Sequence, residues 1–311
     1  MSTKSGILAL LSALLLMVGC TGADKVKALK APSELPGQVY DTATGRPLST
    51  QQLITLLKDT DYLLLGEKHD DPIHHDLQYQ IVQALIEAGK KPAVVFEMFN
   101  REDSGVIATA ARNSPANPDP IAKAVNWEDS GWPDWQWYRP IVAAALKAKL
   151  PIVAGNIARP RLQLMAFGQG SDLLTPRMLQ TYGLLQSLPD AQSEHLQGIL
   201  ASAHGSGEKM APWMLQGFLK AQRLRDASMA DSMITRNSGQ GAILITGQIH
   251  ARNDFGVPYY LRYREPGARI ASLAFIESNS FKATQSDSKL KTTHDYVWVL
   301  PNSQGLRTAQ K

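Results

Sequence analysis

The chain has 311 residues, of which 44% are hydrophobic and 19% are charged. This length allows one large domain or two modest ones, and the composition favours a buried core over disorder. The formal net charge is +4 without a dense cluster of Lys and Arg, so we expect no nucleic-acid partner. The single cysteine excludes internal disulfides, cysteine-rich zinc sites and iron–sulfur clusters. Any metal or cofactor must therefore be held by His, Tyr, carboxylate or amide groups.

Residues 1–19 have the pattern of a lipoprotein signal peptide. Lys4 precedes an apolar run from Gly6 to Val18, which is too short to cross a bilayer core of roughly 30 Å. The run ends next to Cys20, so the segment resembles a bacterial signal in which this cysteine becomes the acylated N-terminus. An ordinary secretory signal with an incidental cysteine is the alternative.

The residues after Cys20 indicate where the lipid anchor would lie. Thr21 favours the outer membrane over the inner membrane by the usual sorting rule. Residues 20–36 show no sustained periodicity, and we expect them to form a flexible tether. The sequence therefore predicts a protein of the bacterial cell envelope that is anchored in the outer membrane and faces the periplasm.

Four short apolar runs predict strands that are buried on both faces, as in a parallel sheet. They lie at residues 62–65, 93–96, 151–154 and 242–245. Two later β-rich stretches, at residues 269–276 and 296–300, extend the predicted sheet. The expected fold class is α/β, with a mainly parallel sheet that is flanked by helices.

Helices are predicted between these strands. In residues 72–88 apolar side chains recur every four residues, Pro72 stands in the first turn and Gly89 closes the end. A second helix is expected from about Trp135 to Lys149. The order strand, helix, strand is the βαβ pattern of a parallel sheet.

A different composition marks the middle of the chain. Residues 159–237 are rich in Leu, Gln, Met and Ala and contain no strand-like run. This predicts an inserted, all-helical subdomain. It divides the α/β domain into a first part, residues 37–158, and a second part, residues 238–311.

Polar side chains follow the predicted strands at the points where the strands end. Ligands of open parallel sheets bind beyond these carboxyl ends. Ionisable groups rarely stand at the tip of a buried strand unless they are paired, bind a metal or line a cleft. The sequence therefore predicts a strand-end cleft, with a divalent metal as one option, that is formed by Glu67, His69, Glu97, Asn156 and His250. The alternative is that Glu67, Asp70 and Asp71 are helix caps and His69 is a hydrogen-bonded spacer.

The segment from Trp127 to Tyr138 contains four of the six tryptophans. This density is typical of the wall of a pocket for a large flat ligand, and a hydrophobic plug between domains is the alternative. At the end of the segment, the phenol of Tyr138 could bind a metal. The guanidinium of Arg139 could bind a carboxylate.

Several short motifs follow one another in a fixed order along most of the chain. They are Gly66-Glu67-Lys68-His69-Asp70, His75, Phe96-Glu97-Met98-Phe99, Trp135-x-x-Tyr138-Arg139-Pro140, Ala154-Gly155-Asn156, Gln222-x-x-x-Asp226-x-x-Met229-Ala230 and Gly247-x-x-His250. The ordered set resembles the ChaN family of haem-binding lipoproteins, which is part of the wider Tiki and erythromycin-esterase-like group. The lipoprotein signal is typical of the same family.

The resemblance implies a protein of haem and iron uptake, which binds two haems face to face in a homodimer. A Tyr of one subunit would ligate each iron, and a His and a Lys of the partner would hold the propionates. The candidates are Tyr138 and Tyr182, followed by Tyr259, for the iron, and His204 and Lys209, with His195 in reserve, for the propionates. A phenolate is a hard anionic ligand that favours ferric iron, which suits reversible haem carriage.

A hydrolase is the competing hypothesis. The strand-end residues could bind a divalent metal that activates water, or His69 or His250 could act as a general base without metal. The resemblance to the wider group implies hydrolytic relatives, but the sequence contains no nucleophile elbow and no HExxH helix. A non-catalytic envelope protein with another role is the third hypothesis.

Overall fold

The computed structural model describes residues 36–169, 174–204, 211–237, 239–285 and 293–302. The predicted signal peptide and the lipidation site Cys20 lie outside these residues. The centre of the described part is one sheet with the strand order β2-β1-β8-β7-β3-β6-β4-β5.

The sheet is mainly parallel. Its strands are β1 (Gln38–Asp41), β2 (Pro47–Leu48), β3 (Tyr62–Glu67), β4 (Ala93–Asn100), β5 (Ile152–Asn156), β6 (Ala242–Gly247), β7 (Ile270–Glu277) and β8 (Tyr296–Leu300). All neighbouring pairs from β8 to β5 are parallel, whereas β1 is antiparallel to both β8 and β2. The predicted α/β class is therefore confirmed, and a short antiparallel pair is added at one edge.

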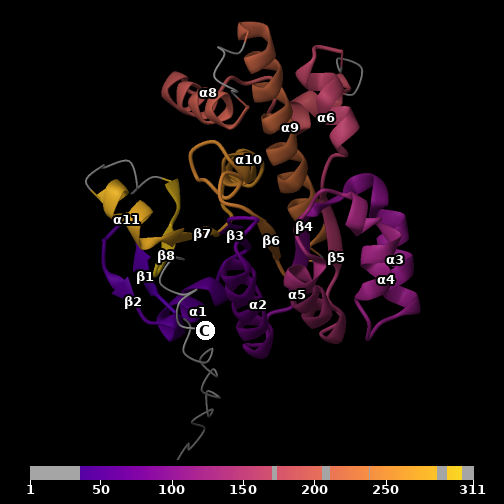
Figure 1. The fold of residues 1–311 in the computed structure, drawn as a ribbon, viewed down its shortest axis with the longest axis vertical. Helices are drawn as coiled ribbons and strands as arrows, with labels where there is room; N and C mark the ends of the chain where they lie inside the picture. Colours follow the sequence, from indigo (N-terminus) through magenta and orange to yellow (C-terminus); the bar gives the residue numbers. More distant parts are fainter. Residues whose placement is uncertain (1–35, 170–173, 205–210, 238, 286–292, 303–311) are drawn as a thin grey trace, which may run out of the picture.

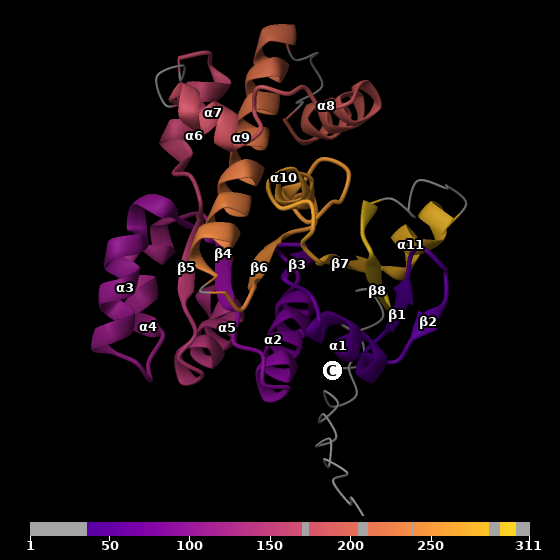
Figure 2. The ribbon, with the colours of Figure 1, turned by 180° about the vertical axis from the view of Figure 1, so that it is seen from behind.

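Helices cover both faces of the sheet (Figure 1 and Figure 2). The helices are α1 (Thr50–Lys58), α2 (Pro72–Glu87), α3 (Ser104–Asn113), α4 (Asp119–Ala124), α5 (Trp135–Lys147), α6 (Arg159–Ala166), α7 (Pro176–Thr181), α8 (Asp190–His204), α9 (Pro212–Arg236), α10 (Val257–Arg264) and α11 (Ser278–Gln285), with the 3-10 turns η1 (Arg101–Asp103) and η2 (Trp127–Asp129). Among the described helices, none combines the length and the apolar character that crossing a membrane requires.

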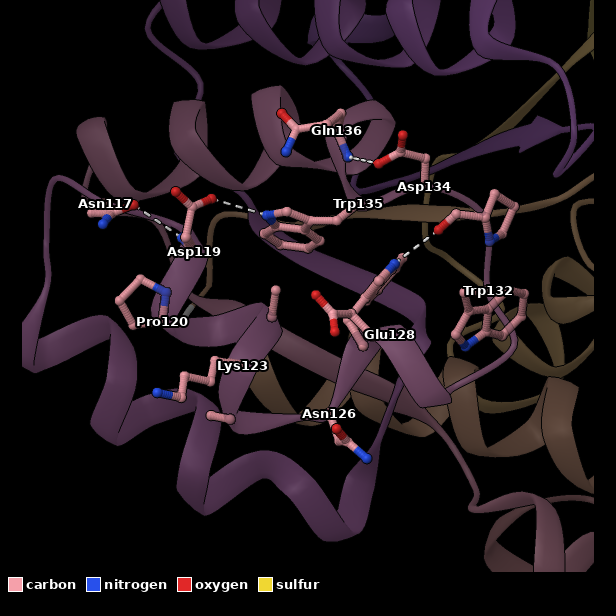
Figure 3. Close-up of a pocket in the computed structure, with 14 residues that line it drawn as sticks. Asn117, Asp119, Pro120, Lys123, Asn126, Glu128, Trp132, Asp134, Trp135 and Gln136 are labelled. Carbon is pink, nitrogen blue, oxygen red and sulfur yellow. Dashed lines mark hydrogen bonds between the residues drawn. The ribbon is translucent and has the colours of Figure 1, made fainter.

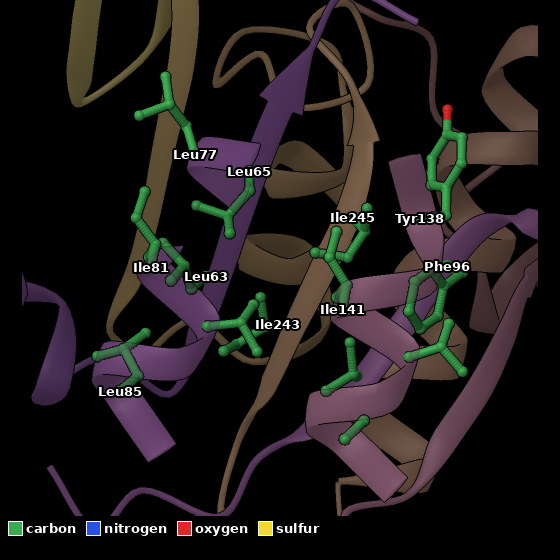
Figure 4. Packing of buried hydrophobic residues seen from close by; sticks show 14 of the residues in the cluster. Leu63, Leu65, Leu77, Ile81, Leu85, Phe96, Tyr138, Ile141, Ile243 and Ile245 are labelled. Atoms are coloured by element: carbon green, nitrogen blue, oxygen red, sulfur yellow. The ribbon is translucent and has the colours of Figure 1, made fainter. Parts of the chain in front are cut away.

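The pleat of the central strands separates two hydrophobic clusters. In β3, Leu63 and Leu65 belong to the cluster that contains residues of α2 and α5, whereas Tyr62 and Leu64 belong to the cluster on the side of α9 and α10. Figure 4 shows the first cluster, with Leu77 of α2 close to these strand residues. Because both faces are covered, every residue of β3 is buried and its sequence shows no polar alternation.

Helices α6, α7, α8 and the first half of α9, here called the insert, lie between β5 and β6 in the sequence. In space they stand beyond the carboxyl ends of the strands (Figure 1). All described elements between Arg159 and Arg236 are helices. The second half of the long helix α9 leaves the insert and packs on β5, where the hydroxyls of Ser228 and Ser232 donate hydrogen bonds of 3.1 Å to strand carbonyls. This helix therefore connects the insert to the sheet and passes directly over the strand ends.

Candidate functional site

The predicted strand-end residues meet at the carboxyl edge of β3, β4 and β6. Glu67 Oε1 lies 2.6 Å from His69 Nδ1, and Glu97 Oε1 lies 3.2 Å from His250 Nε2. Gly247 lies between the two pairs, since a Cβ atom there would stand 3.0 Å from the His69 ring and 3.7 Å from Glu97 Oε2. The missing side chain at Gly247 allows the two pairs to lie side by side.

The carboxylate of Glu97 is surrounded by hydrogen-bond donors. Arg225 Nη2 of α9 lies 2.5 Å from Oε1, and the Thr246 hydroxyl and the Gly247 N–H donate to Oε2 at 2.7 and 2.8 Å. Burial alone would raise the pKa of Glu97, but the positive charges of His250 and Arg225 outweigh it and hold the pKa well below its usual range. Glu97 is therefore ionised at neutral pH.

His250 lies between two carboxylates. Its Nδ1 is 2.5 Å from Asp226 Oδ1, and the side chains of both residues are almost completely buried. Burial lowers the pKa of His250, but Glu97 and Asp226 outweigh it and raise the pKa to about 9. Glu97, Arg225, Asp226 and His250 thus form a charged network, the strand-end network, that joins α9 to the sheet.

The second pair, Glu67 and His69, is more open. The Glu67 side chain is fully buried, whereas 39% of the His69 side chain is exposed. Burial raises the pKa of Glu67 to about 7. Glu67 Oε2 has no partner among the described residues, and none of them forms a hydrogen bond with His69 Nε2. The pair therefore presents a polarised imidazole to solvent.

The sequence did not predict the role of Arg225. Gln222, Arg225 and Asp226 are spaced three and four residues apart, on the face of α9 that turns toward the strand ends. Gln222 Nε2 also lies 3.1 Å from His250 Nδ1. The signal that could have identified Arg225 is this polar triplet directly before an Ala- and Met-rich turn that is buried.

A divalent metal at this edge was one option of the prediction, and the described residues do not support it. Within the described ranges, no cluster of three or more His, Cys, Asp or Glu side chains is arranged to hold a metal ion. Basic side chains already contact the carboxylates: Arg225 and His250 contact Glu97, and His69 contacts Glu67. Asn156, the fifth predicted residue, accepts a hydrogen bond from Arg225 at 3.3 Å.

The placement of Tyr138 argues against its predicted role as an iron ligand. Its side chain is fully buried, and its hydroxyl donates a hydrogen bond of 3.4 Å to Glu67 Oε1. Burial raises the pKa of the phenol, and the charges of Glu67 and Glu97 raise it further. The predicted carboxylate clamp Arg139 is already paired with Asp119, at 2.7 Å.

Tyr182 has different surroundings. Its phenol oxygen accepts a hydrogen bond from Arg101 at 2.9 Å and donates one of 3.4 Å to Asp231 Oδ2. Burial raises the pKa of Tyr182, and the guanidinium of Arg101 acts in the opposite direction. The residue lines a pocket of about 290 Å³, the Tyr182 pocket, whose other walls are Arg101, Glu102, Ile157, Arg161, Leu174, Met178, Leu224 and Ser228.

The tryptophan-rich segment is partly core and partly pocket wall. Trp127 is 5% exposed and packs edge-on against Trp135, with ring centroids 5.1 Å apart. Trp132 and Trp135 are half-buried and line a cavity of about 1180 Å³, here called the tryptophan cavity (Figure 3). Trp127 therefore belongs to the main hydrophobic core, whereas Trp132 and Trp135 line a pocket.

A family model described as "Haem-binding uptake, Tiki superfamily, ChaN" matches residues 53–261. The chain belongs to this haem-binding ChaN family. Among solved structures, it is similar to the ChaN of Campylobacter jejuni in a structure of cofacial haem binding, with 22% identity and a TM-score of 0.67 over 84% of this chain and 96% of that chain. An erythromycin esterase mutant in its open conformation has 13% identity and a TM-score of 0.47, over 86% of this chain and 97% of that chain. No curated protein matches the sequence.

The other haem-binding candidates of this ChaN protein are only partly described. Lys209 and the side chain of His204 lie outside the described residues. His195 is exposed on α8, with its ring 6.0 Å from that of Phe255. Tyr259 is half-buried in α10 and packs edge-on against its neighbour Tyr260.

Proposed function

We propose that this ChaN-family protein binds haem through Tyr182. The observation that supports this choice is the hydrogen bond from Arg101 to the Tyr182 phenol at the wall of a pocket. Burial and the Asp231 carboxylate raise the pKa of Tyr182, and the guanidinium of Arg101 acts against both. A phenolate is a suitable ligand for ferric iron. At Tyr138, burial and the Glu67 and Glu97 carboxylates all raise the pKa of the phenol, and no neighbouring cation among the described residues acts against them.

The surroundings of Tyr182 also fit the rest of a haem molecule. Leu174 lines both the Tyr182 pocket and a second pocket of about 370 Å³, whose other walls are Met165, Gly168, Leu179, Leu184, Lys220 and Arg223. The apolar side chains of the two pockets suit the porphyrin plane. Lys220 is exposed and forms no ion pair with another described residue, so its positive charge suits the carboxylate of a propionate.

Replacement of Tyr182 by Phe tests the assignment. We expect native protein titrated with haemin to show the charge-transfer band of a ferric tyrosinate complex. Tyr182→Phe should abolish that band and weaken haemin binding by at least about tenfold, because the phenolate oxygen is lost. Tyr259→Phe is the matched control, since Tyr259 lies in α10 and should leave the spectrum unchanged. A native spectrum in Tyr182→Phe would contradict the assignment.

A homodimer is part of the same proposal. The insert exposes large apolar side chains, namely Leu164, Phe167, Leu185 and Trp213, which are 42%, 50%, 68% and 59% exposed. Exposed apolar surface of this kind is typical of a protein interface. We propose that two copies face each other across this surface and enclose two haems, with the chain anchored in the outer membrane through a lipidated Cys20. Size-exclusion chromatography during the haemin titration tests the dimer.

Acid–base hydrolysis without a metal is a second candidate function. The observation that favours it is the Glu67–His69 pair, in which Glu67 fixes Nδ1 of a half-exposed imidazole and leaves Nε2 without a hydrogen bond from any described residue. This arrangement orients a histidine as a general base for water. Burial lowers the pKa of His69, but the hydrogen bond that His69 donates to Glu67 and the charge of Glu97 outweigh it and raise the pKa.

An ester substrate tests this candidate. If the pair is a general base, His69→Gln should lower the rate of p-nitrophenyl acetate hydrolysis by at least about a hundredfold. His195→Gln is the matched control, because His195 is exposed on α8, whereas the Glu67–His69 pair lies at the end of β3. Equal rates in the native protein and in His69→Gln would contradict the proposal that this pair catalyses hydrolysis. The haemin titration is unaffected by that result, since it depends on Tyr182.

A further inference from the structure

The tryptophan cavity has two half-exposed indoles in its wall, those of Trp132 and Trp135 (Figure 3). Trp135 is held in place, because its N–H donates a hydrogen bond of 3.1 Å to Asp119 Oδ1. Asp119 is fixed in turn by Arg139 at 2.7 Å. A volume of about 1180 Å³ exceeds that of a single bound ring, so the cavity has room for a ligand of several rings.

Several polar groups of the cavity are available to a ligand. The exposed side chains of Lys123 and Glu128 form no hydrogen bond or ion pair with other described residues. The indole N–H of Trp132 likewise has no acceptor within the described part of the chain. Together they offer a cationic donor, an anionic acceptor and a neutral donor around an aromatic wall.

The charge of the cavity argues against haem as its ligand. Its lining contains the carboxylates of Asp119, Glu128 and Asp134 but only one basic side chain, that of Lys123. Arg139 neutralises Asp119, so Glu128 and Asp134 leave an excess of negative charge over Lys123, which would repel the two carboxylates of a haem. The Tyr182 pocket, in contrast, is lined by Arg101 and Arg161 beside a single carboxylate, that of Glu102.

We propose that the tryptophan cavity binds a saccharide, at a site separate from the haem pocket. A sugar ring has an apolar C–H face that packs on an indole, and its neutral hydroxyls both donate and accept hydrogen bonds. A neutral ligand avoids the repulsion that the carboxylates exert on an anion. An organic cation would require a closed aromatic cage, whereas Trp127 is buried and leaves only Trp132 and Trp135 with a polar rim.

The tryptophan cavity adjoins the Glu67–His69 pair through one side chain, that of Trp132. The edge of Trp132 meets the His69 ring, with centroids 5.0 Å apart and planes at 73°. A sugar against Trp132 would therefore change the environment of His69. Trp132 thus contacts both the tryptophan cavity and the half-exposed imidazole of the Glu67–His69 pair.

Saturation-transfer NMR on the haem-free full chain tests the proposal, with chitotriose and maltotriose as probes. We expect saturation of the aromatic protons to reach the ring C–H protons of at least one probe at millimolar concentration. Transfer to chitotriose alone would identify an N-acetylated amino sugar as the ligand class, and transfer to maltotriose alone would identify a glucan. Transfer to neither sugar, or binding of choline in their place, would overturn the proposal.

Substitutions locate the site. Trp132→Ala should weaken the binding of whichever sugar shows saturation transfer by about tenfold. Glu128→Gln should weaken it severalfold, and the variant should fold normally because Glu128 is exposed. Trp213→Ala is the matched control: this indole is 59% exposed on α9, outside the cavity, and its removal should leave sugar binding unchanged. Native affinity in both Trp132→Ala and Glu128→Gln would overturn the assignment of the site, as would competition between haemin and the sugar.

Discussion

Replacement of Glu97 by Gln is expected to lower the free energy of unfolding by about 3–5 kcal/mol. The substitution keeps the shape of the side chain but removes its negative charge. Arg225 and His250 then lose the carboxylate that lies 2.5 Å and 3.2 Å from them. His250 keeps Asp226 as a partner, but Arg225, whose side chain is 23% exposed, pairs with no other described carboxylate. Removing one partner of a mostly buried ion pair destabilises the folded state, because the remaining cation has no compensating charge. Urea denaturation at neutral pH measures the change.

Glu102→Gln provides the matched control for this prediction. Glu102 forms an ion pair of 3.0 Å with Arg161, but 37% and 45% of the two side chains are exposed. Solvent screens such pairs, and the same chemical change should cost no more than about 1 kcal/mol. Similar losses in Glu97→Gln and Glu102→Gln would show that burial does not determine the strength of the strand-end network.

The strands were predictable because their burial is visible in the sequence. The runs at 62–65 and 242–245 contain only large apolar residues or alanine, which is what a strand covered on both faces requires. The strand-end residues were predictable for the same reason, since Glu67 and Glu97 directly follow such runs. Parallel strands place the residues at their carboxyl ends along one edge of the sheet, and this does not depend on how the connecting helices pack.

The partners of these residues were not predictable in the same way. Arg225 reaches Glu97 only because α9 crosses the strand ends, and that path depends on packing between residues more than one hundred positions apart. The environment of Tyr138 has the same origin. Its helix was predicted, but which helix face turns toward Glu67 follows from the packing of α5 on α2 and not from the local sequence. The choice between Tyr138 and Tyr182 therefore needed the three-dimensional structure.

The stability that His250 provides is expected to disappear as the pH rises from about 6.5 to about 9. The pKa of this imidazole is raised from its usual value of 6.5 to about 9 in the folded chain. Below pH 6.5 the His250 imidazole is protonated in both the folded and the unfolded chain, and its attraction to Glu97 and Asp226 contributes fully to the free energy of unfolding. Between the two values the unfolded chain releases the proton first, so stability falls with rising pH.

Comparison with His250→Gln isolates this effect from the other titrating groups. A shift of this size corresponds to about 3 kcal/mol, so the difference in unfolding free energy between the native protein and the variant should shrink by about that amount from pH 6.5 to pH 9. Glu67, with a pKa of about 7, also reduces stability as the pH rises, but it is present in both proteins and largely cancels. A difference that stays constant or grows with pH would mean that His250 is neutral in the folded chain. The network would then contain one ion pair, that of Arg225 with Glu97, and hydrogen bonds to a neutral His250.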